Sequence, residues 1–399
     1  MSGIVRTALL AWDYPPAPSG LSTAAREIAE SLAARDVAVT VFTLDRIGMG
    51  EAGGVAVRGI GLAPGSALAR LRLWGSAGHL AAPLAFYRAV LDAHARQPFD
   101  CIEATNWYAP AAFLTRSGPP LVTRNSTPAA FTRGPATSLR DRLDGRTADR
   151  LERWQARGSA GLISNTDDHA VRIASLYGIP PRQAHAVIGL SLPPDMLQRG
   201  RTAPYPDAVE APVRLLFVGR AEARKGFDLL LDAAALLGAE CEAGIVPPFV
   251  VDLVGVSEAD LPQGVSALAR RHLRALGRID GASLAESYGR AHLVLAPSRY
   301  ESFGLVYQES LAYGRPVVAC AADASARAFV GRPGAGLLAQ EATGAALADA
   351  IRPLLRDPDL RTKLRARALA ASGAFDRARL GSETLALYER AIAAARQGR

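Results

Sequence analysis

The chain has 399 residues, of which 49% are hydrophobic, 21% are charged and 6% are aromatic. This length suits two ordinary domains with a core each, and the composition excludes a disordered, collagen-like or low-complexity protein. The three cysteines are widely separated, which argues against a disulfide framework or a four-thiolate zinc site and makes a reducing cytosol the expected compartment. Because no signal-peptide pattern and no run of about 18 apolar residues occurs, we expect no membrane span.

The formal net charge of +8 is carried almost wholly by arginine, since only Lys225 and Lys363 among the 46 basic residues are lysines. A basic chain can suit nucleic acid or anionic lipid as a partner. The charge is dispersed, however, and no block of about five or six like charges marks a binding tail. We therefore expect no nucleic-acid partner.

The N-terminal half opens as strand, loop, helix and strand. Residues 5–12 form an apolar run, residues 23–34 place Ala and Leu at helical spacing, and residues 37–43 alternate like a strand. Such a βαβ unit predicts a parallel sheet with helices on its faces. The turn before the helix holds Gly20, which permits close approach of a ligand to the backbone, and the helix N-terminus favours an anion there. The alternative is that Gly20 serves turn geometry alone.

The same order of elements returns in the C-terminal half. Its β-branched runs are predicted strands and its Ala- and Leu-rich runs are predicted helices. In chain order these five elements are 213–219, 226–237, 249–254, 284–291 and 293–296. The repetition predicts an α/β fold of two doubly wound, Rossmann-like domains.

The expected linker between the domains is the segment 193–212, which holds five prolines. The first domain then covers residues 1–192 and the second covers residues 213–381. The tail, residues 382–396, is helical by pattern and could pack on either half.

Two segments of the first half are less regular. Residues 67–95 mix large apolar side chains with arginines, and residues 138–157 are dense in charge of both signs. The simpler interpretation is a pair of surface helices. The alternative is a basic and apolar face that lies on a membrane surface, which would bring the protein close to a lipid acceptor.

A loop with three cations follows the first strand of the second half, over residues 219–226. Arg220 and Lys225 could meet one diphosphate there, because a guanidinium offers a planar fork and an ammonium offers a compact point charge. The alternative is an exposed basic loop in which Gly226 acts as a cap. The scarcity of lysine in this chain favours the diphosphate.

The strongest candidate is the segment 297–309, which places Glu301 and Glu309 on either side of a predicted helix start. Each carboxylate can accept hydrogen bonds from hydroxyls in a different part of one ligand. The amides that follow Phe303 at the helix start would face the phosphates of that ligand. Solvated helix residues are the alternative for either glutamate alone.

Four segments together resemble the family 4 retaining glycosyltransferases, the glycosyl transferases group 1, which have the GT-B fold. The run 297–319 resembles the Glu-x7-Glu signature of that family, and the run 218–226 resembles its phosphate-binding loop. Residues 276–279 resemble its base-binding segment, and residues 14–43 resemble its opening. The four segments follow one another in the family's order.

The resemblance implies two Rossmann-like domains that face each other across a cleft, with the acceptor on the first and the donor on the second. It implies a metal-independent, retaining hexosyltransferase without cofactors. The enzyme would move a sugar from a nucleotide-sugar, UDP favoured over GDP, to a hydroxyl acceptor in glycan, glycolipid or natural-product biosynthesis. The expected location is cytoplasmic, with peripheral membrane contact as an option.

The resemblance also implies roles for individual residues. Arg220 and Lys225 would hold the diphosphate, and Glu301 would contact hydroxyls of the transferred sugar. The remaining donor contacts implied are Gly20 beneath the reacting groups, Gly219 in the phosphate loop, Ile279 beside the nucleobase, the backbone of Phe303, Gly304, Leu305 and Val306, and Glu309 at the ribose.

The chain departs from the family pattern at three places. Ser19 precedes Gly20 where a Gly-Gly pair is usual, and Ser126 stands where a histidine commonly precedes Thr-Pro. Residues 323–327 replace the usual Gly-Gly-x-x-Glu stretch. An unusual donor, an unusual acceptor or reduced activity would each fit these departures.

We expect no metal site, because positioned cations and amides can stabilise a departing diphosphate by themselves. Asp357-Pro358-Asp359 matches an Asp-x-Asp metal motif only superficially, and we interpret it as a loop. The six histidines show no metal-ligand spacing, and His169 is expected on the surface at a helix start.

Two other classes of function compete with this interpretation. An NAD-linked oxidoreductase would show Gly-x-Gly-x-x-Gly after the first strand, and the only similar run, residues 331–336, lies in the wrong context. A non-catalytic, glycosyltransferase-like partner protein is favoured by the missing histidine. The presence of both glutamates, Arg220 and Lys225 argues against it.

Overall fold

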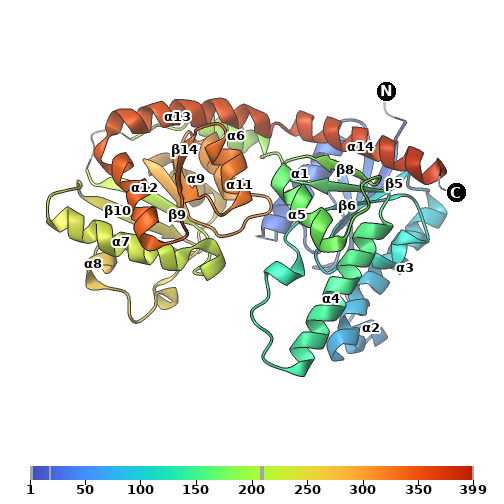
Figure 1. Ribbon diagram of the computed structural model, residues 1–399. Helices are drawn as coiled ribbons and strands as arrows, with labels where there is room; N and C mark the ends of the chain where they lie inside the picture. The colour runs from blue at the N-terminus through green and yellow to red at the C-terminus, as the bar shows by residue number, and fades with distance from the viewer. Residues whose placement is uncertain (1–2, 18, 207–210, 398–399) are drawn as a thin grey trace. The chain divides into compact units, whose positions relative to one another are not determined.

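The computed structural model describes residues 3–17, 19–206 and 211–397 (Figure 1). These residues divide into two compact units. Unit 1 comprises Met1–Ser191 together with Asp376–Arg399, and unit 2 comprises Leu192–Phe375. Each unit contains one predominantly parallel sheet flanked by helices, as the repeated strand–helix order predicts.

Unit 1 has an eight-stranded sheet in the order β3-β4-β2-β1-β5-β6-β7-β8, in which only the edge pair β3–β4 is antiparallel among the described residues. Its strands are β1 (Arg6–Ala11), β2 (Ala38–Thr43), β3 (Ile47–Ala52), β4 (Val55–Ile60), β5 (Cys101–Thr105), β6 (Leu121–Arg124), β7 (Gly161–Ser164) and β8 (Ala184–Val187). Its α-helices are α1 (Gly20–Ala33), α2 (Ala67–Leu71), α3 (Ala81–Arg96), α4 (Leu139–Gly158), α5 (Asp167–Tyr177) and α14 (Arg377–Gln397).

Unit 2 has a six-stranded parallel sheet in the order β11-β10-β9-β12-β13-β14. Its strands are β9 (Val213–Val218), β10 (Phe249–Val254), β11 (Leu273–Gly277), β12 (Leu293–Ala296), β13 (Val317–Cys320) and β14 (Gly336–Ala339). Its α-helices are α6 (Pro194–Thr202), α7 (Phe227–Glu242), α8 (Ala267–Arg270), α9 (Gly281–Arg290), α10 (Leu305–Ala312), α11 (Ala324–Ala326), α12 (Gly344–Arg356) and α13 (Pro358–Ser372).

The central strands of unit 2 bury both faces, which explains their continuous apolar runs. Leu215 and Phe217 of β9 belong to the core under α7 and α12, whereas Leu216 belongs to the core under α9 and α10. Successive strand residues point to opposite faces, so a parallel strand between two helix layers must be apolar throughout. The predicted strands at 213–219, 249–254 and 293–296 are confirmed for this reason.

The predicted start of unit 1 is also confirmed, with α1 beginning three residues earlier than its apolar pattern suggests. Ser19 is the N-cap of α1, and its Oγ accepts a hydrogen bond from Ser22 N over 3.0 Å. The same hydroxyl donates to Asp13 Oδ2 over 2.6 Å. Ser19 therefore has a structural role, in which its side chain orders the turn that carries Gly20.

The segment 193–212 is not an irregular linker as expected, because it contains helix α6 and belongs to unit 2. Pro194 occupies the first turn of α6, where a missing N–H costs no hydrogen bond. Gly200 lies so close to α10 that a Cβ there would be 2.4 Å from Ala312 O. Residues 207–210 of this segment lie outside the described residues.

The C-terminal helix α14 is longer than the predicted 382–396 and packs on unit 1. Arg377, at its start, forms an ion pair with Glu27 of α1 at 2.6 Å. Further along, the Tyr388 hydroxyl donates to Glu103 Oε2 over 2.6 Å, beneath the unit 1 sheet. Unit 1 is thus built from both ends of the chain.

The less regular segments of unit 1 form helices that are only partly on the surface. Phe86 and Val90 of α3 are fully buried, so the 67–95 segment contributes to the core. Helix α4 begins with a capping box between Ser138 and Asp141 and buries Glu152 on its inner face. Among the described residues, no helix combines the length and hydropathy needed to cross a bilayer.

Candidate active site

Two loops of unit 2 lie against each other at the carboxyl ends of β9 and β12. The chain turns at Gly226 with a φ of +68°, and a Cβ there would lie 2.0 Å from the carbonyl oxygen of Pro297. Two hydrogen bonds join the loops: Arg299 N donates to Arg224 O over 2.9 Å, and Arg224 Nη1 donates to Tyr300 O over 3.1 Å. Glycine is therefore needed at 226 both for the backbone conformation and for the close contact between the loops.

Lys225 and Glu301 form an ion pair across these loops. Nζ of Lys225 lies 2.5 Å from Oε1 of Glu301, and the two side chains are only 19% and 12% exposed. Ser298 Oγ donates to the same carboxylate oxygen over 2.8 Å. Solvent and salt screen such a pair less than a surface pair, so the attraction between the two charges is stronger. This attraction holds both groups in a defined position.

Asp323 fixes the backbone of Glu301 from below. Its Oδ1 accepts from Glu301 N over 3.0 Å, and its Oδ2 accepts from the Tyr307 hydroxyl over 2.7 Å. Burial raises the pKa of the Asp323 carboxyl to about 6. Ser325 Oγ completes the support by donating to Glu301 O over 2.7 Å. The segment that departs from the family pattern therefore positions the first glutamate.

Sequence reasoning missed this support, although a local signal was present. Asp323 is the N-cap of the short helix α11, and the sequence Asp-Ala-Ser-Ala after an apolar strand is typical of such a cap. The cap predicts the local turn only. It does not predict that the same carboxylate reaches an amide 22 residues earlier in the chain.

Helix α10 begins beside Glu301 at Gly304, which has a φ of +61°. A Cβ at this position would lie 2.9 Å from the Tyr307 ring and 3.1 Å from the Phe329 ring, so a side chain does not fit. The first amides of α10, those of Leu305 and Val306, have no intrahelical carbonyl to donate to. They carry the positive end of the helix dipole to the same strand edge as Lys225.

Glu309 lies one turn further along α10 in a separate environment. It is partly buried, and Tyr288 donates its hydroxyl hydrogen to Glu309 Oε2 over 2.8 Å. Burial raises the pKa of Glu309 to about 7, against the lowering effects of the Tyr288 hydrogen bond and the Lys225 charge. No hydrogen bond joins the two glutamates among the described residues, in agreement with the expectation that they need not pair, although the Lys225 charge acts on both.

Comparison with known proteins identifies the family. The model for Glycosyl transferases group 1 matches residues 206–370, and the model for the Glycosyl transferase 4-like domain matches residues 19–189. A D-inositol 3-phosphate glycosyltransferase of Kineococcus radiotolerans is 31% identical, over 98% of this chain and 96% of that protein. The chain belongs to the family 4 glycosyltransferases. The corresponding protein of Actinosynnema mirum is also 31% identical to this glycosyltransferase, over 93% of this chain and 92% of that one.

Solved structures show that the glycosyltransferase has the GT-B fold. Sucrose-phosphate synthase from Thermosynechococcus elongatus superimposes with a TM-score of 0.73 at 22% identity, over 98% of this chain and all of that chain. WaaG, a glycosyltransferase of lipopolysaccharide biosynthesis, superimposes with a TM-score of 0.69 at 19% identity, over 95% of this chain and 98% of that chain. Membership in this family rules out the NAD-linked oxidoreductase, and the relatives from Kineococcus and Actinosynnema are named as enzymes rather than as inactive partners.

The remaining predicted donor residues of the glycosyltransferase lie at several places. The Arg220 side chain is 70% exposed and pairs with Glu222 of the same loop at 2.6 Å. Gly219 lies against Gly255, where a Cβ would be 2.6 Å from Gly219 O. Ile279 is partly buried after β11 and packs against the core under α9. Gly20 is exposed at the first position of α1, in unit 1.

Ser126, which replaces the usual histidine, is buried after β6 in unit 1. Its backbone N–H donates to Asn106 Oδ1 over 2.6 Å, and its Oγ lies 2.9 Å from Thr105 Oγ1. Asn106 in turn donates through Nδ2 to the Tyr177 hydroxyl over 2.9 Å. The serine is thus part of a polar network that orders the end of β5, where the turn carrying Trp107 and Tyr108 begins.

Two smaller expectations are wrong. His169 is buried rather than on the surface, because it lies on the same inner face of α5 as Ile173 and Tyr177, whereas Asp167 and Asp168 are exposed; burial lowers the pKa of His169 to about 4. Asp357 is not part of a free loop, because its side chain caps α13 by accepting from Leu360 N over 2.9 Å. Within the ranges described, no group of three or more His, Cys, Asp or Glu side chains is arranged to hold a metal ion.

The raised pKa of Glu309 predicts a pH-dependent stability. With a pKa of about 7, the Glu309 carboxyl keeps its proton in the folded protein at pH values where the unfolded chain, with a glutamate pKa of 4.5, has already lost it. The free energy of unfolding therefore falls as the pH rises from about 4.5 to about 7. Between pH 5 and pH 8, we expect the unfolding free energy of Glu309→Gln to rise by up to about 2 kcal/mol relative to that of the wild type, because glutamine does not ionise. Urea denaturation at both pH values measures the difference in unfolding free energy. A difference that does not change with pH would contradict the assignment.

Proposed function

We propose that this glycosyltransferase transfers a sugar from a UDP-sugar to a hydroxyl acceptor with retention at the anomeric carbon and without a metal ion. The observation that carries the proposal is the fixed Lys225–Glu301 pair beside the first amides of α10. The fold is shared with HepE from Anabaena, solved with UDP and glucose, at a TM-score of 0.64 and 20% identity. That likeness supports a UDP-sugar as the first donor to test, and a GDP-sugar is the second.

The proposed step breaks the bond between the anomeric carbon and the diphosphate oxygen. The acceptor oxygen forms its bond to the same carbon on the same face, and its proton passes to the departing phosphate oxygen. Negative charge therefore grows on the diphosphate, where Lys225 and Arg220 would stabilise it together with the amides of Leu305 and Val306. Glu301 would accept hydrogen bonds from the sugar hydroxyls.

The other donor contacts are proposed at the nucleoside. Glu309 would accept from ribose hydroxyls, and Ile279 would lie beside the nucleobase. Gly219 and Phe303 would offer backbone to the phosphates and the sugar, and Gly20 of unit 1 would lie beneath the reacting groups. Full activity in the presence of excess EDTA would support the metal-independent step, and activity restored only by a divalent cation would overturn it.

A thermal-shift panel tests the donor. We expect UDP or its sugars to stabilise the folded protein by about 2.7 kcal/mol at 100 times their dissociation constant, because the ligand binds only the folded state. GDP and NAD serve as comparisons in the same panel. A rise in melting temperature with GDP alone would replace UDP by GDP in the proposal. The absence of a rise with any nucleotide would contradict the assignment of a nucleotide-sugar donor.

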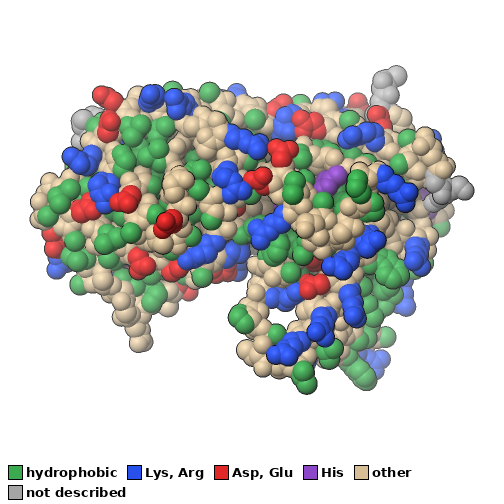
Figure 2. All heavy atoms as spheres, viewed as in Figure 1, with side chains coloured by type: hydrophobic (Ala, Val, Ile, Leu, Met, Phe, Trp, Pro, Cys, Tyr) green, Lys and Arg blue, Asp and Glu red, His purple; other side chains and the backbone are tan. Residues whose placement is uncertain are grey.

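We also propose peripheral membrane contact through an apolar patch of unit 1. Four large apolar side chains are exposed where α2 and the turn after it lie near the start of α4: Leu73 at 79%, Trp74 at 74%, Leu139 at 76% and Leu143 at 56%. Helix α4 packs against the 3-10 helix Gly75–Leu80, which brings these segments together. Figure 2 shows basic and apolar side chains mixed on the part of unit 1 where Figure 1 draws α2 and α4. Such a mixture suits an anionic lipid surface.

Vesicle co-sedimentation tests this contact. We expect Leu73→Ser with Trp74→Ser to weaken binding to anionic vesicles by about tenfold or more, because two apolar side chains no longer enter the interface. Leu236→Ser is the matched control, since Leu236 is 45% exposed on α7 of unit 2. Equal sedimentation of wild type and double variant would overturn the proposal.

A further inference from the structure

Asp323 is a buried carboxylate at the edge of the unit 2 sheet that carries the candidate site. It follows β13, the neighbour of β12 in the sheet, so its loop lies beside the loop that carries Glu301. Asp323 is only 1% exposed, and no basic side chain of the described residues forms an ion pair with it. A carboxylate buried without a counter-charge lowers the stability of the fold when it ionises.

The Asp323 carboxylate accepts four hydrogen bonds, three of them from backbone amides. Oδ1 accepts from Glu301 N over 3.0 Å and from Ser325 N over 3.4 Å. Oδ2 accepts from the Tyr307 hydroxyl over 2.7 Å and from Ala326 N over 3.2 Å. An amide can only donate, so this arrangement suits an ionised carboxylate, which accepts at both oxygens.

A proton on Asp323 would disturb this arrangement. Only the Tyr307 hydroxyl can turn to accept that proton, because Ala296 O lies 3.4 Å from the hydroxyl and can take its hydrogen. The bond from Glu301 N would then end on a neutral carboxyl group. Since a charge-assisted hydrogen bond is roughly twice as strong as a neutral one, the backbone of Glu301 would be held less firmly.

We propose that the ionised carboxylate of Asp323 is a positioning group for sugar transfer, and that transfer weakens when Asp323 takes a proton. The carboxylate acts through the backbone of Glu301, whose side chain is held by Lys225 and Ser298 and would contact hydroxyls of the sugar. Ser325 Oγ holds the carbonyl of the same residue over 2.7 Å. The inference rests on the proposed function, to which it adds a positioning residue and a pH dependence.

The ionisable groups around Asp323 leave it as the group that titrates near pH 6. Burial raises the pKa of Asp323 to about 6 and the Glu301 charge adds to this rise, against the lowering hydrogen bonds from Tyr307 and Glu301 N. Tyr307 on α10 and Cys320 on β13 stay neutral near this pH. Burial raises the pKa of Tyr307 well above its usual value and that of Cys320 to about 11.

The arginines of the adjoining segments make contacts elsewhere. Arg299 pairs with Asp228 at 2.6 Å. Arg327, directly after α11, donates to Ala321 O over 2.5 Å. Neither guanidinium forms an ion pair with Asp323, so no cation favours its ionised form directly.

The pH dependence of donor use tests this role. We measure kcat/KM for hydrolysis of UDP-glucose or UDP-N-acetylglucosamine, whichever is faster, in the wild type and in Asp323→Asn. Each phosphate of these donors keeps a single negative charge between pH 5 and pH 8, and the titration of Glu309 affects both proteins alike. We expect the ratio of wild type to variant to rise from below about twofold at pH 5 to about tenfold or more at pH 8, with a midpoint near pH 6.

Asp357→Asn is the matched control. Asp357 is also a helix N-cap of unit 2, and its side chain accepts from Leu360 N over 2.9 Å. Asparagine caps a helix about as well as aspartate does, so we expect the control to stay within about twofold of the wild type at every pH. A constant ratio of wild type to Asp323→Asn across the pH range, or equal kcat/KM at pH 8, would overturn the proposal.

Tyr307→Phe tests the titration of Asp323 through its hydrogen-bond partner. The hydroxyl lowers the pKa of Asp323 by donating to Oδ2, so its removal raises that pKa. We compare Tyr307→Phe with the double variant that also carries Asp323→Asn, and we expect the midpoint of their ratio to lie at higher pH than in the first comparison. An unmoved midpoint would show that a group other than Asp323 titrates.

Thermal unfolding separates positioning from support of the fold. Because the pKa of Asp323 is about 6 in the folded protein and 3.8 in the unfolded chain, the free energy of unfolding falls as the pH rises from about 3.8 to about 6. From pH 5 to pH 7, we expect the melting temperature of the wild type to fall relative to Asp323→Asn, while its relative kcat/KM rises. Changes of both in the same direction would assign Asp323 a structural role only.

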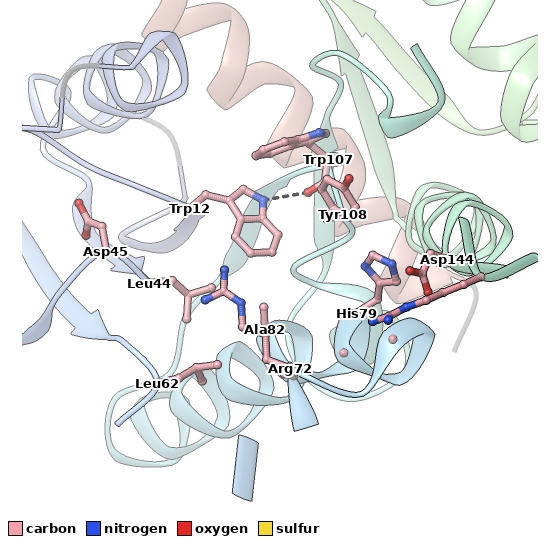
Figure 3. A pocket seen from close by; sticks show the side chains of 14 residues that line it. Trp12, Leu44, Asp45, Leu62, Arg72, His79, Ala82, Trp107, Tyr108 and Asp144 are labelled. Carbon is pink, nitrogen blue, oxygen red and sulfur yellow. Dashed lines mark hydrogen bonds between the residues drawn. The ribbon is translucent and has the colours of Figure 1, made fainter. Parts of the chain in front are cut away.

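Unit 1 provides a check that the substitution acts locally. Trp12 meets Trp107 edge to face at 5.9 Å, and its Nε1 donates to Trp107 O over 2.8 Å (Figure 3). Because all four tryptophans belong to unit 1 and Asp323 belongs to unit 2, we expect Asp323→Asn to keep the wild-type emission spectrum. A changed spectrum would contradict a local positioning role.

The failure of this inference is distinguishable from the failure of the proposed function. Titration calorimetry with UDP tests the donor assignment without a sugar. If UDP binds and a UDP-sugar is hydrolysed while Asp323→Asn behaves as the wild type, the positioning role is wrong and the proposed transfer stands. If no nucleotide binds or no UDP-sugar is used, the proposed function fails and this inference fails with it.

Discussion

Replacement of Lys225 by methionine is expected to lower kcat/KM for sugar transfer by about 10²- to 10³-fold. The ammonium is positioned beside Glu301 at 2.5 Å and at the strand edge that receives the diphosphate in the proposed mechanism. Removal of one preorganised group that stabilises developing charge typically costs about 3 kcal/mol in the transition state. Steady-state kinetics with the UDP-sugar and a hydroxyl acceptor measure the loss.

Lys363→Met is the matched control for this experiment. It is the other lysine of the chain, and it lies exposed on α13. The same chemical change there is expected to leave kcat/KM within about twofold of the wild type. Equal kinetics for Lys225→Met and Lys363→Met would remove Lys225 from the site.

Glu301→Gln tests whether the charge of the Glu301 side chain, rather than its shape, is needed. The amide keeps the shape of the side chain but loses the charge that holds Lys225 and the strongest acceptors for sugar hydroxyls. We expect kcat to fall by at least about a hundredfold while UDP affinity changes little, because UDP lacks the sugar. A proportional loss of UDP binding would assign Glu301 a structural role in the loop instead.

Glu103→Ala is expected to destabilise unit 1 by about 3–5 kcal/mol. Glu103 is fully buried, where it accepts from Arg124 Nε over 2.7 Å and from the Tyr388 hydroxyl over 2.6 Å. Removing the carboxylate leaves the guanidinium of Arg124 buried without its counter-charge, which is among the costliest single changes in a protein. It also removes an anchor of α14 on the sheet of unit 1.

Urea denaturation followed by tryptophan emission measures this effect selectively. All four tryptophans, Trp12, Trp74, Trp107 and Trp154, belong to unit 1, so the signal reports the unfolding of that unit. The control is Asp149→Ala in unit 1, which breaks the pair of the 45% exposed Asp149 with Arg133 at 2.6 Å and is expected to cost less than about 1 kcal/mol. A cost below about 1 kcal/mol for Glu103→Ala would contradict the role given to the buried pair.

The fold was largely predictable because its signals are local. Parallel strands buried on both faces must be continuous apolar runs, and β9, β10 and β12 appear at the positions where the sequence has them. The prediction of an irregular linker over 193–212 was wrong because a proline is permitted in the first turn of a helix. Pro194 marks the start of α6 rather than a break. The prediction that His169 lies on the surface was wrong because the two aspartates before it identify a helix start but not the face of the helix that packs on the sheet.

The sequence proposed the residues of the candidate site, and their roles stay predictions. The scarcity of lysine and the spacing of Glu301 and Glu309 singled out the unit 2 loops. Arg220 was expected to meet the same diphosphate as Lys225, which stays a prediction, and its exposed side chain pairs with Glu222 of the same loop. No sequence motif predicted the support that Asp323 gives to the backbone of Glu301.

The sequence by itself determined the two Rossmann-like domains, the family and the loops proposed to carry the chemistry, because apolar periodicity and short motifs act between neighbours in the chain. Only the tertiary structure decided which side chains meet. Lys225 reaches Glu301 across 76 residues, and Trp12 meets Trp107 across 95 residues, because parallel strands bring distant loops to one sheet edge. Such contacts depend on strand order and packing, which no local pattern encodes.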